Sequence, residues 1–167
     1  MSVKIGLLSD THGWLDPKLI SFFKDCDEVW HCGDMGDVSV ADELVAKFTF
    51  RAVYGNIDGM PLRHMYPEVA VFECEKVKVL MTHIGGYPGR YDAQIYPRLL
   101  KERPALFVCG HSHITKVMFD EKLNCLHINP GAAGRYGAQK VRTAVRFVID
   151  GDRIKDLELI ELGEERL

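Results

Sequence analysis

The sequence lacks the features of secreted, membrane-spanning and nucleic-acid-binding proteins. Its five cysteines are odd in number and form no Cys-x-x-Cys pair, which argues against a disulfide framework or a structural zinc site. No apolar run approaches the ~18 residues of a membrane helix, and the start of the chain has no signal-peptide pattern. Lys and Arg total 21 against 24 Asp and Glu, so the formal charge of −3 gives no overall attraction to nucleic acid or anionic lipid. We therefore expect a cytoplasmic protein with no membrane partner and no strong nucleic-acid partner.

The composition is that of an ordinary globular protein. The chain has 167 residues, of which 47% are hydrophobic and 27% charged. It contains no repeat, linker or low-complexity segment. We therefore expect one domain over residues 1–167.

Hydrophobic patterning predicts an α/β fold with two sheets. The first third alternates strands and helices, with strands near 3–8, 28–32 and 50–54 and helices over 17–23 and 38–48. Asp16 is the expected N-cap of the first helix, with Pro17 at its first position. The rest predicts three hairpins (69–73 with 77–82, 116–120 with 124–128, 141–149 with 153–161), a helix over 91–103 and a strand over 105–109. Early helices and later hairpins favour two sheets packed face to face with helices outside.

Polar side chains follow five of these strands, at the point where each strand ends. The carboxyl ends of parallel strands share one edge of a sheet, and ligands of open α/β sheets bind there. We therefore expect the five loops to meet at one edge. The side chains they deliver are Asp10, His12, Asp34, Asn56, His83, His111 and His113.

This set combines oxygen ligands with imidazole nitrogens and contains no thiolate. Such a mixture suits manganese, iron, zinc or nickel better than calcium or magnesium. Seven ligands are too many for one tetrahedral ion, and they suit two divalent ions about 3.5–4 Å apart that share a carboxylate. Two divalent ions opposed by Asp10 and Asp34 leave a positive surplus, which would attract phosphate.

The ordered motifs resemble those of the calcineurin-like metallophosphoesterase superfamily, and its small bacterial and archaeal phosphodiesterase branch in particular. They are Asp10-x-His12, Gly33-Asp34-x-x-Asp37, Gly55-Asn56-x-Asp58, His83, Gly110-His111-x-His113 and Asn129-Pro130-Gly131. The resemblance implies a four-layer α-β-β-α sandwich of two mixed sheets, with a dinuclear centre at the C-terminal edges of the strands. It assigns one ion to Asp10, His12, Asp34 and His113. It assigns the other to Asp34, Asn56, His83 and His111, with Asp34 bridging the two.

Two positions depart from the family pattern. Many members carry a histidine after the asparagine of the third motif, and this histidine is the usual candidate for protonating the leaving group. Here that position is Ile57, which cannot donate a proton. Relatives often carry another histidine two residues after the one matching His83, and here that residue is Gly85.

We expect a metal-dependent phosphoric ester hydrolase, and a phosphodiesterase rather than a monoesterase. A hydroxide bridging two ions would attack phosphorus, while Asn56 and the histidines stabilise charge on the equatorial oxygens. Manganese is the expected metal, with nickel, iron and zinc as alternatives, and a small phosphoester is the expected partner. A homo-oligomer is left open. The residues given catalytic roles are Asn56, Asp58, His83 and His111.

Two rival functions stay open: a phosphomonoesterase on the same site, and a non-catalytic interaction scaffold like the retromer subunit that this family resembles. All seven ligand positions are filled, which favours an enzyme. The absent histidine at Ile57 favours diesters, or esters whose leaving oxygen needs little protonation.

Several side chains have two interpretations at this level. Asp37 is favoured as a helix N-cap over a catalytic group. Asp58 either braces the site or sits in a turn. Arg90 and Tyr91 follow a glycine-rich loop and either bind substrate, with Arg90 as a phosphate clamp, or belong to a surface loop. His31 and His127 lie in apolar strands and are expected to be structural.

Overall fold

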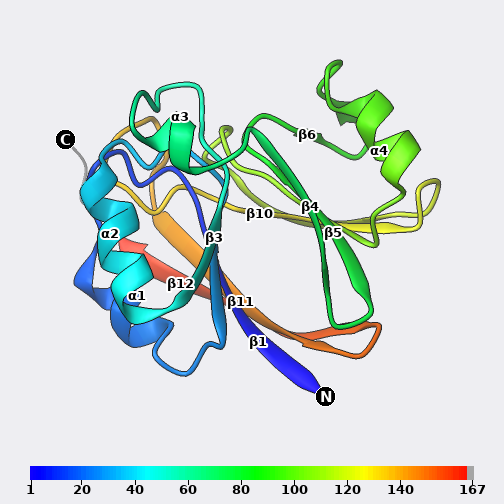
Figure 1. Ribbon diagram of the computed structural model, residues 1–167, viewed down its shortest axis with the longest axis horizontal. Helices are drawn as coiled ribbons and strands as arrows, with labels where there is room; N and C mark the ends of the chain where they lie inside the picture. Colours follow the sequence, from blue (N-terminus) through cyan, green and yellow to red (C-terminus); the bar gives the residue numbers. More distant parts are fainter. Residues whose placement is uncertain (165–167) are drawn as a thin grey trace.

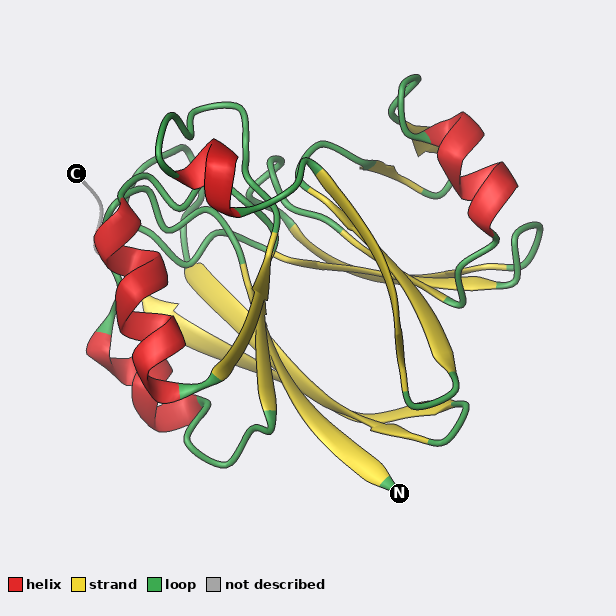
Figure 2. Cartoon of the chain, viewed as in Figure 1, coloured by secondary structure: helices red, strands yellow, loops and turns green. Residues whose placement is uncertain are grey.

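The computed structural model describes residues 1–164 as two five-stranded sheets packed face to face, with helices on their outer faces (Figures 1 and 2). The sheets have the orders β12-β11-β1-β2-β3 and β4-β5-β8-β10-β9, and β6-β7 forms a separate ribbon. The strands are β1 (Ser2–Leu8), β2 (Glu28–His31), β3 (Thr49–Ala52), β4 (Val69–Cys74), β5 (Val77–Thr82), β6 (Gly86–Tyr87), β7 (Arg90–Tyr91), β8 (Leu106–Val108), β9 (Thr115–Asp120), β10 (Cys125–Pro130), β11 (Arg142–Asp150) and β12 (Arg153–Gly163). The helices are α1 (Pro17–Phe22), α2 (Val38–Lys47), α3 (Leu62–Met65) and α4 (Tyr96–Glu102).

The first sheet grows from the predicted β-α-β-α-β unit. Strands β1, β2 and β3 are parallel, and the C-terminal hairpin β11-β12 adds to the free side of β1. The Asp16 side chain accepts a hydrogen bond from the Lys18 amide at the start of α1. The Asp37 side chain does the same for the Ser39 amide at the start of α2. Both predicted N-caps are therefore confirmed, and the Asp37 carboxylate serves the helix.

The second sheet contains the two other predicted hairpins, β4-β5 and β9-β10, around the central strand β8. Strands β5, β8 and β10 run parallel, and β4 and β9 are antiparallel edges. The predicted helix over 91–103 is too long: α4 begins at Tyr96, and Tyr91 instead pairs with Gly86 in the ribbon. Pro97 explains the difference, because proline is tolerated only in the first turn of a helix.

Three apolar layers hold these elements together. Between the sheets lie side chains such as Trp30, Val108 and Phe147, all fully buried. Leu19 and Leu44 pack α1 and α2 onto the first sheet. On the other side of the sandwich, α4 packs on the second sheet through Leu99 (Figure 1). The order helix, sheet, sheet, helix confirms the four-layer prediction, and each fully buried side chain of this kind contributes roughly 1.5–3 kcal/mol.

The packing brings the carboxyl ends of β1, β2, β3, β5 and β8 to one end of the sandwich, where long loops gather (Figure 2). None of the helices within residues 1–164 is both long and apolar enough to cross a bilayer.

Candidate metal centre

Six of the seven predicted ligands form two clusters at this end of the sandwich. Asp10, His12 and His113 make the first cluster, and Asp34, His83 and His111 make the second. Within each cluster the candidate ligand atoms all lie within 4.8 Å of one another. The loops after β1 and β2 supply the two carboxylates, and the loops after β5 and β8 supply three of the imidazoles.

Asp34 lies between the two clusters. Its Oδ2 atom is 3.1 Å from His83 Nε2 and 3.6 Å from His12 Nε2, and those histidines belong to different clusters. Its Oδ1 atom accepts a hydrogen bond from the Ile57 amide at 3.1 Å. One carboxylate oxygen is thus fixed by the backbone, and the other faces both clusters.

The charges of the site are strongly coupled. Burial would raise the pKa of Asp10, but the hydrogen bond from His113 and the nearby His12 ring outweigh it and hold that pKa well below its usual range. Burial also opposes ionisation of Asp34, yet the adjacent His83 ring lowers the pKa of that carboxyl. The hydrogen bond to Asp10 in turn raises the pKa of His113. Both carboxylates are therefore ionised at neutral pH, and the site attracts positive charge.

The imidazoles of His12, His83 and His113 are oriented with their Nε2 atoms toward the carboxylates. His83 Nδ1 lies 2.8 Å from the Cys32 carbonyl and donates to it, and His113 Nδ1 lies 2.8 Å from Gln139 Oε1. Such outer contacts orient the ring and direct the other nitrogen toward a metal, which for His113 is the nitrogen that now contacts Asp10. His12 Nε2 and His83 Nε2 are buried without a hydrogen-bond partner in the described part of the chain. Buried polar atoms are rarely left unpaired, so these two nitrogens fit divalent metal ions.

Five of the seven ligand residues adopt left-handed backbone conformations, with φ between 48° and 71°. They are Asp10, His12, Asp34, His111 and His113. Outside glycine this region is sparsely populated, although Asp, Asn and His enter it more often than other residues. A residue held there costs on the order of 1–3 kcal/mol, so the surrounding contacts must fix the loops firmly.

Asp58 supplies much of that restraint. Its carboxylate accepts hydrogen bonds from the amides of Gly55 and Gly36, each at 2.8 Å, and from that of Met35 at 3.2 Å. The side chain therefore ties the loop after β3 to the loop after β2. Of its two interpretations from sequence, this geometry favours the brace, because a carboxylate engaged by three amides is an acceptor with no proton to donate.

Asn129 restrains the loop that carries His111 and His113. Its Nδ2 atom donates to the Gly110 carbonyl and to Ser112 Oγ, both at 3.1 Å. Its Oδ1 atom accepts from the Gly131 amide at 2.9 Å. The Asn129-Pro130-Gly131 motif, at the end of β10, thus holds in place the loop that carries His111 and His113.

Asn56 lies at the exposed side of the second cluster. A pocket of about 790 Å³ opens beside it and is lined also by His83, Ile84 and Arg63. Arg63 donates to the backbone carbonyls of Asp58 and Asn56, so its guanidinium is held next to this pocket. Sequence reasoning missed Arg63, because no motif marks it and α3 was not predicted.

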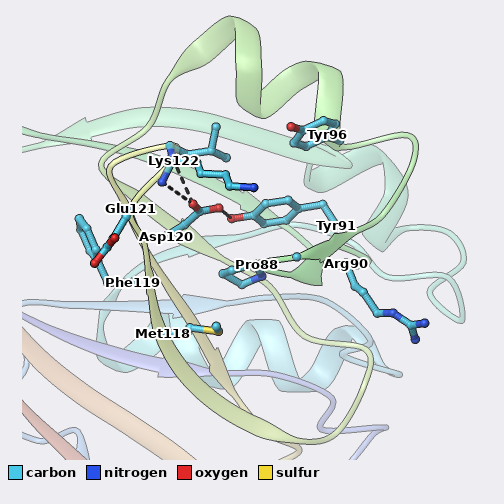
Figure 3. Close-up of a pocket in the computed structure, with 11 residues that line it drawn as sticks. Pro88, Arg90, Tyr91, Tyr96, Met118, Phe119, Asp120, Glu121 and Lys122 are labelled. Carbon is cyan, nitrogen blue, oxygen red and sulfur yellow. Dashed lines mark hydrogen bonds between the residues drawn. The ribbon is translucent and has the colours of Figure 1, made fainter.

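Arg90 and Tyr91 lie elsewhere. They line a different pocket, of about 680 Å³, on the outer face of the second sheet (Figure 3). The two pockets share no lining residue. The Tyr91 hydroxyl donates to Asp120 at 2.6 Å, and the Arg90 side chain is exposed. The structure therefore does not bring these two residues together with the metal ligands.

Two further residues support the site without having been predicted to do so. Gln139 orients His113, as described above, and its Nε2 atom donates to the Gly134 and Tyr136 carbonyls. The Tyr136 ring stacks on His12, with ring centroids 5.2 Å apart. Only the glycine-rich stretch before them marks this segment in the sequence, and glycines serve turns as often as ligand sites.

Two proteins of similar sequence are named as probable metallophosphoesterases. A probable metallophosphoesterase of Methanothermobacter thermautotrophicus is 29% identical over 167 residues, covering 95% of this chain and 92% of its own. A probable metallophosphoesterase of Methanocaldococcus jannaschii is 29% identical over 134 residues, covering 77% and 67%. The structure of vacuolar protein sorting 29 from Cryptosporidium parvum aligns with a TM-score of 0.78 at 15% identity, covering 97% of this chain and 98% of that chain, which indicates a shared fold.

The family assignment rests on most of the chain. Residues 3–152 match the family model described as the calcineurin-like phosphoesterase superfamily domain. That span includes both carboxylates, every histidine of the two clusters and both bracing residues, Asp58 and Asn129. The chain belongs to the calcineurin-like phosphoesterase superfamily.

Proposed function

We propose that this protein is a dinuclear metal-dependent phosphodiesterase that hydrolyses a P–O bond of a small phosphoester. The observation that carries the proposal is Asp34 Oδ2, which faces two clusters that each contain one buried imidazole nitrogen, His12 Nε2 or His83 Nε2, without a hydrogen-bond partner in the described chain. Asp10, His12, Asp34 and His113 would hold one ion, and Asp34, Asn56, His83 and His111 the other. Two bound divalent ions would stabilise charge on the phosphoryl oxygens and activate a water molecule as nucleophile. We propose manganese first, with nickel, iron and zinc as alternatives for this oxygen and nitrogen set.

The chain's own side chains orient the substrate. Asn56 and His111 are both exposed at the second cluster, so their polar atoms are accessible to a phosphoryl oxygen. The adjoining pocket, lined by Asn56 and His83, would take one ester group. Arg63, held on two carbonyls at the rim of this pocket, adds a positive charge that favours an anionic substrate.

The preference for diesters rests on the absence of a proton donor beside the leaving group. Ile57 is exposed next to Asn56 and has no titratable group. Asp58, its neighbour, is engaged by three amides and cannot donate. The best substrate is therefore an ester whose leaving group departs without protonation, such as the ester of a phenol or of another acidic alcohol.

An interaction scaffold is the second candidate. The fold is similar to vacuolar protein sorting 29, and Ile57, Ile84 and Ile114 each follow a predicted ligand and are exposed. Exposed apolar residues around a polar centre favour either an apolar ester group or a protein surface. The intact ligand set favours the enzyme, because a scaffold has no need of the unpartnered imidazoles. The free cysteines agree with the cytoplasmic location that we propose.

The decisive experiment measures metal and activity together. Purified protein, stripped with a chelator and reloaded with manganese, nickel, iron or zinc, is assayed on an activated aryl phosphodiester and on the matching aryl phosphomonoester. We expect two ions per chain and faster, metal-dependent hydrolysis of the diester. Two bound ions with no hydrolysis of either ester would favour the scaffold, whereas faster turnover of the monoester would replace the diesterase with a monoesterase.

A further inference from the structure

Strand β9 is an apolar sheet edge. Within residues 1–164 it is hydrogen-bonded to one strand, β10, and ends the order of the second sheet. Three successive side chains of β9 are largely solvent-accessible: Val117 is 46% exposed, Met118 44% and Phe119 52%. None of the three belongs to any of the apolar layers in the described chain. An unpaired apolar edge is a template for another strand.

The other sheet edges are protected in ways that β9 is not. On β4, Phe72 packs against Trp30, and the Arg51 guanidinium lies 4.2 Å from its ring. Strand β3 is only four residues long. Strand β12 exposes Leu157 and Leu159, but it also carries charged side chains along its length and departs from regular strand geometry at Asp156, where φ is 55°. Short, charged or irregular edges discourage pairing, whereas β9 contains no proline and no irregular φ.

The register with β10 shows which way the β9 side chains face. Phe119 pairs with Leu126 and Val117 pairs with Ile128, and both of those partners face the layer between the sheets. Met118 pairs with His127, whose ring packs on Phe107 beneath α4. Cross-strand pairs share one face. Val117 and Phe119 therefore face one side of the sheet, and Met118 the other.

The sequence of β9 is complementary to itself when two copies run antiparallel. With Met118 opposite Met118, Lys116 stands opposite Asp120 and Val117 opposite Phe119. Shifting the centre to Val117 would instead set Lys116 opposite Met118 and Thr115 opposite Phe119. Only the first of these two registers matches opposite charges and apolar partners together. We infer that two copies of this chain pair through β9, centred on Met118, and join their second sheets into one continuous sheet.

The charges at the two ends of β9 are already held in place. Lys116 Nζ lies 3.8 Å from the centre of the Tyr87 ring. Asp120 accepts hydrogen bonds from the Tyr91 hydroxyl at 2.6 Å and from the Lys122 amide at 2.9 Å (Figure 3). Side chains ordered before association lose less entropy on binding. The pocket lined by Met118, Phe119 and Tyr91, among other residues, would then border the interface.

Cysteine substitution tests both the dimer and its register. In antiparallel pairs the opposed Cα atoms are about 4.5–5.5 Å apart, within the range that a disulfide spans. Met118→Cys is expected to form a covalent dimer on mild oxidation, seen by non-reducing electrophoresis. Val117→Cys is the register control: it should not crosslink alone but should crosslink when mixed with Phe119→Cys. The native cysteines give little background, because Cys32, Cys74, Cys109 and Cys125 are buried and Cys26 is partly so.

Sedimentation measures the same interface without crosslinking. Phe119→Lys places like charges along the interface and should weaken dimerisation at least tenfold. Leu159→Lys is the matched control, because Leu159 is 48% exposed on the edge strand of the other sheet and its substitution should leave dimerisation unchanged. A wild-type chain that stays monomeric at 100 µM, or a dimer that survives Phe119→Lys without crosslinking through Met118→Cys, would overturn the inference. Diesterase activity per chain should be the same in both lysine variants, so this test is independent of the proposed function.

Discussion

The two sheets contribute different halves of the metal centre, and the halves are held differently. The first sheet supplies the carboxylates, and its loops are fixed by backbone hydrogen bonds such as those from the His12 amide to the Asp34 carbonyl at 3.0 Å and from the Gly13 amide to the Met35 carbonyl at 2.7 Å. The second sheet supplies three imidazoles, two of which are oriented by single contacts from their Nδ1 atoms. The carboxylate loops are thus held within the first sheet, whereas the imidazole loops are held both by Asn129 of their own sheet and by contacts with the first sheet.

We call the contact between the Ser9–Asp10 segment and Cys32 of the first sheet and the His83 and Gly110–His111 segments of the second sheet the seam. The His111 amide donates to Asp10 Oδ2 at 3.0 Å, and His83 donates to the Cys32 carbonyl on the opposite sheet. Gly110 lies against Ser9 and Asp10 so closely that a Cβ atom there would stand 2.0 Å from Ser9 Oγ. The difference between the halves teaches that a change at the contact between the two sets of loops can displace the imidazoles while every proposed ligand stays in place in the sequence.

Loss of the shared carboxylate should have the largest effect. Asp34→Asn removes the charge that faces both clusters, while the amide oxygen can still accept the hydrogen bond from the Ile57 amide. We expect diesterase activity to fall by more than about 100-fold, because even outer-shell changes cost about 10–100-fold in metal sites. Metal content by mass spectrometry should fall by at least one ion per chain.

Asp37→Asn provides the control for that substitution. It makes the same chemical change three residues away, on a side chain that caps α2, and asparagine is an equally good cap. Activity and metal content should stay at the wild-type level. Full activity of Asp34→Asn at saturating metal would contradict the shared-carboxylate assignment.

A methyl group at the seam should come next in size. Gly110→Ala adds a methyl group that must push the His111 loop away from Ser9 and Asp10, while none of the proposed ligand residues is replaced. We expect activity to fall by about 10–100-fold, as for other outer-shell changes. Gly59→Ala is the matched control, since a Cβ atom there meets nothing within 4 Å and the glycine lies in the neighbouring Asn56–Asp58 loop. Equal activities in the two alanine variants would show that the seam does not control the imidazole half.

His127, a buried histidine of the second sheet that is not a proposed ligand, allows the pH dependence of folding to be measured separately from that of metal binding. Burial lowers the pKa of His127 from 6.5 to about 4, so the folded chain keeps this ring neutral while the unfolded chain protonates it. Its contribution to stability is therefore complete above pH 6.5 and is lost as pH falls from there toward 4, at about 1.4 kcal/mol per pH unit. Between pH 7 and pH 5 the free energy of unfolding of the wild type should therefore fall by about 2 kcal/mol more than that of His127→Leu.

Urea unfolding in the presence of a chelator measures this difference free of metal binding. His64→Leu removes an exposed histidine on α3 and should leave the pH dependence of wild type unchanged. The same acid dependence in His127→Leu and wild type would assign the acid sensitivity to other groups.

Metal affinity should weaken in acid because protons and metal ions compete for the same nitrogens. In the metal-free chain, burial alone would lower the pKa of His83, but Asp34 and Asp10 outweigh it and raise that pKa above its usual value. Below this raised pKa the ring binds a proton, and each proton displaced weakens metal binding by about tenfold per pH unit. The acidic limb of the activity profile should therefore move to lower pH as metal is added. A limb that stays fixed over a hundredfold range of metal concentration would exclude ligand protonation as its cause.

Restoring a proton donor should give the smallest change. Ile57→His places an imidazole beside Asn56, and an alkyl phosphomonoester should then gain in kcat/KM relative to an activated aryl diester. A positioned general acid is worth about 10²–10⁴-fold, but the Asp58 carboxylate is already occupied and cannot orient the new ring, so we expect a gain of only a few-fold. An unchanged ratio of the two substrates, with full metal occupancy, would show that leaving-group protonation does not set the preference.

Much of the fold was predictable because strong local patterns mark it. The alternating hydrophobicity of 69–82 and 141–161 gave their hairpins, and Asp16 and Asp37 located two helix starts. The ligand loops were predictable from the polar residues at strand ends. The β6-β7 ribbon was missed because its strands have only two residues each, too few to show a period.

The supporting parts of the site were not predictable in the same way. The left-handed conformation of His113 and the contact from Gln139 depend on segments far apart in sequence, and no spacing rule connects them. Asp58 had two equal interpretations because a brace and a turn residue have the same sequence appearance. Arg90 and Tyr91 were chosen for their nearness to His83 in the chain, but the β6-β7 ribbon directs them to the outer face of the sheet.

The position of β1 has a consequence for biosynthesis. Every proposed ligand has been translated once the ribosome reaches residue 113, but β11, which covers one side of β1 from Ser2 to Leu7, spans residues 142–150. Until β11 emerges, β1 presents an open side rich in apolar residues, and such a side can pair with other nascent chains. Between those two points of translation every proposed ligand is present but β1 still lacks its β11 partner, so we expect its edge to be open to such pairing. Substitutions that delay pairing of β11 should lower the yield of native protein while leaving the activity of each correctly folded molecule intact.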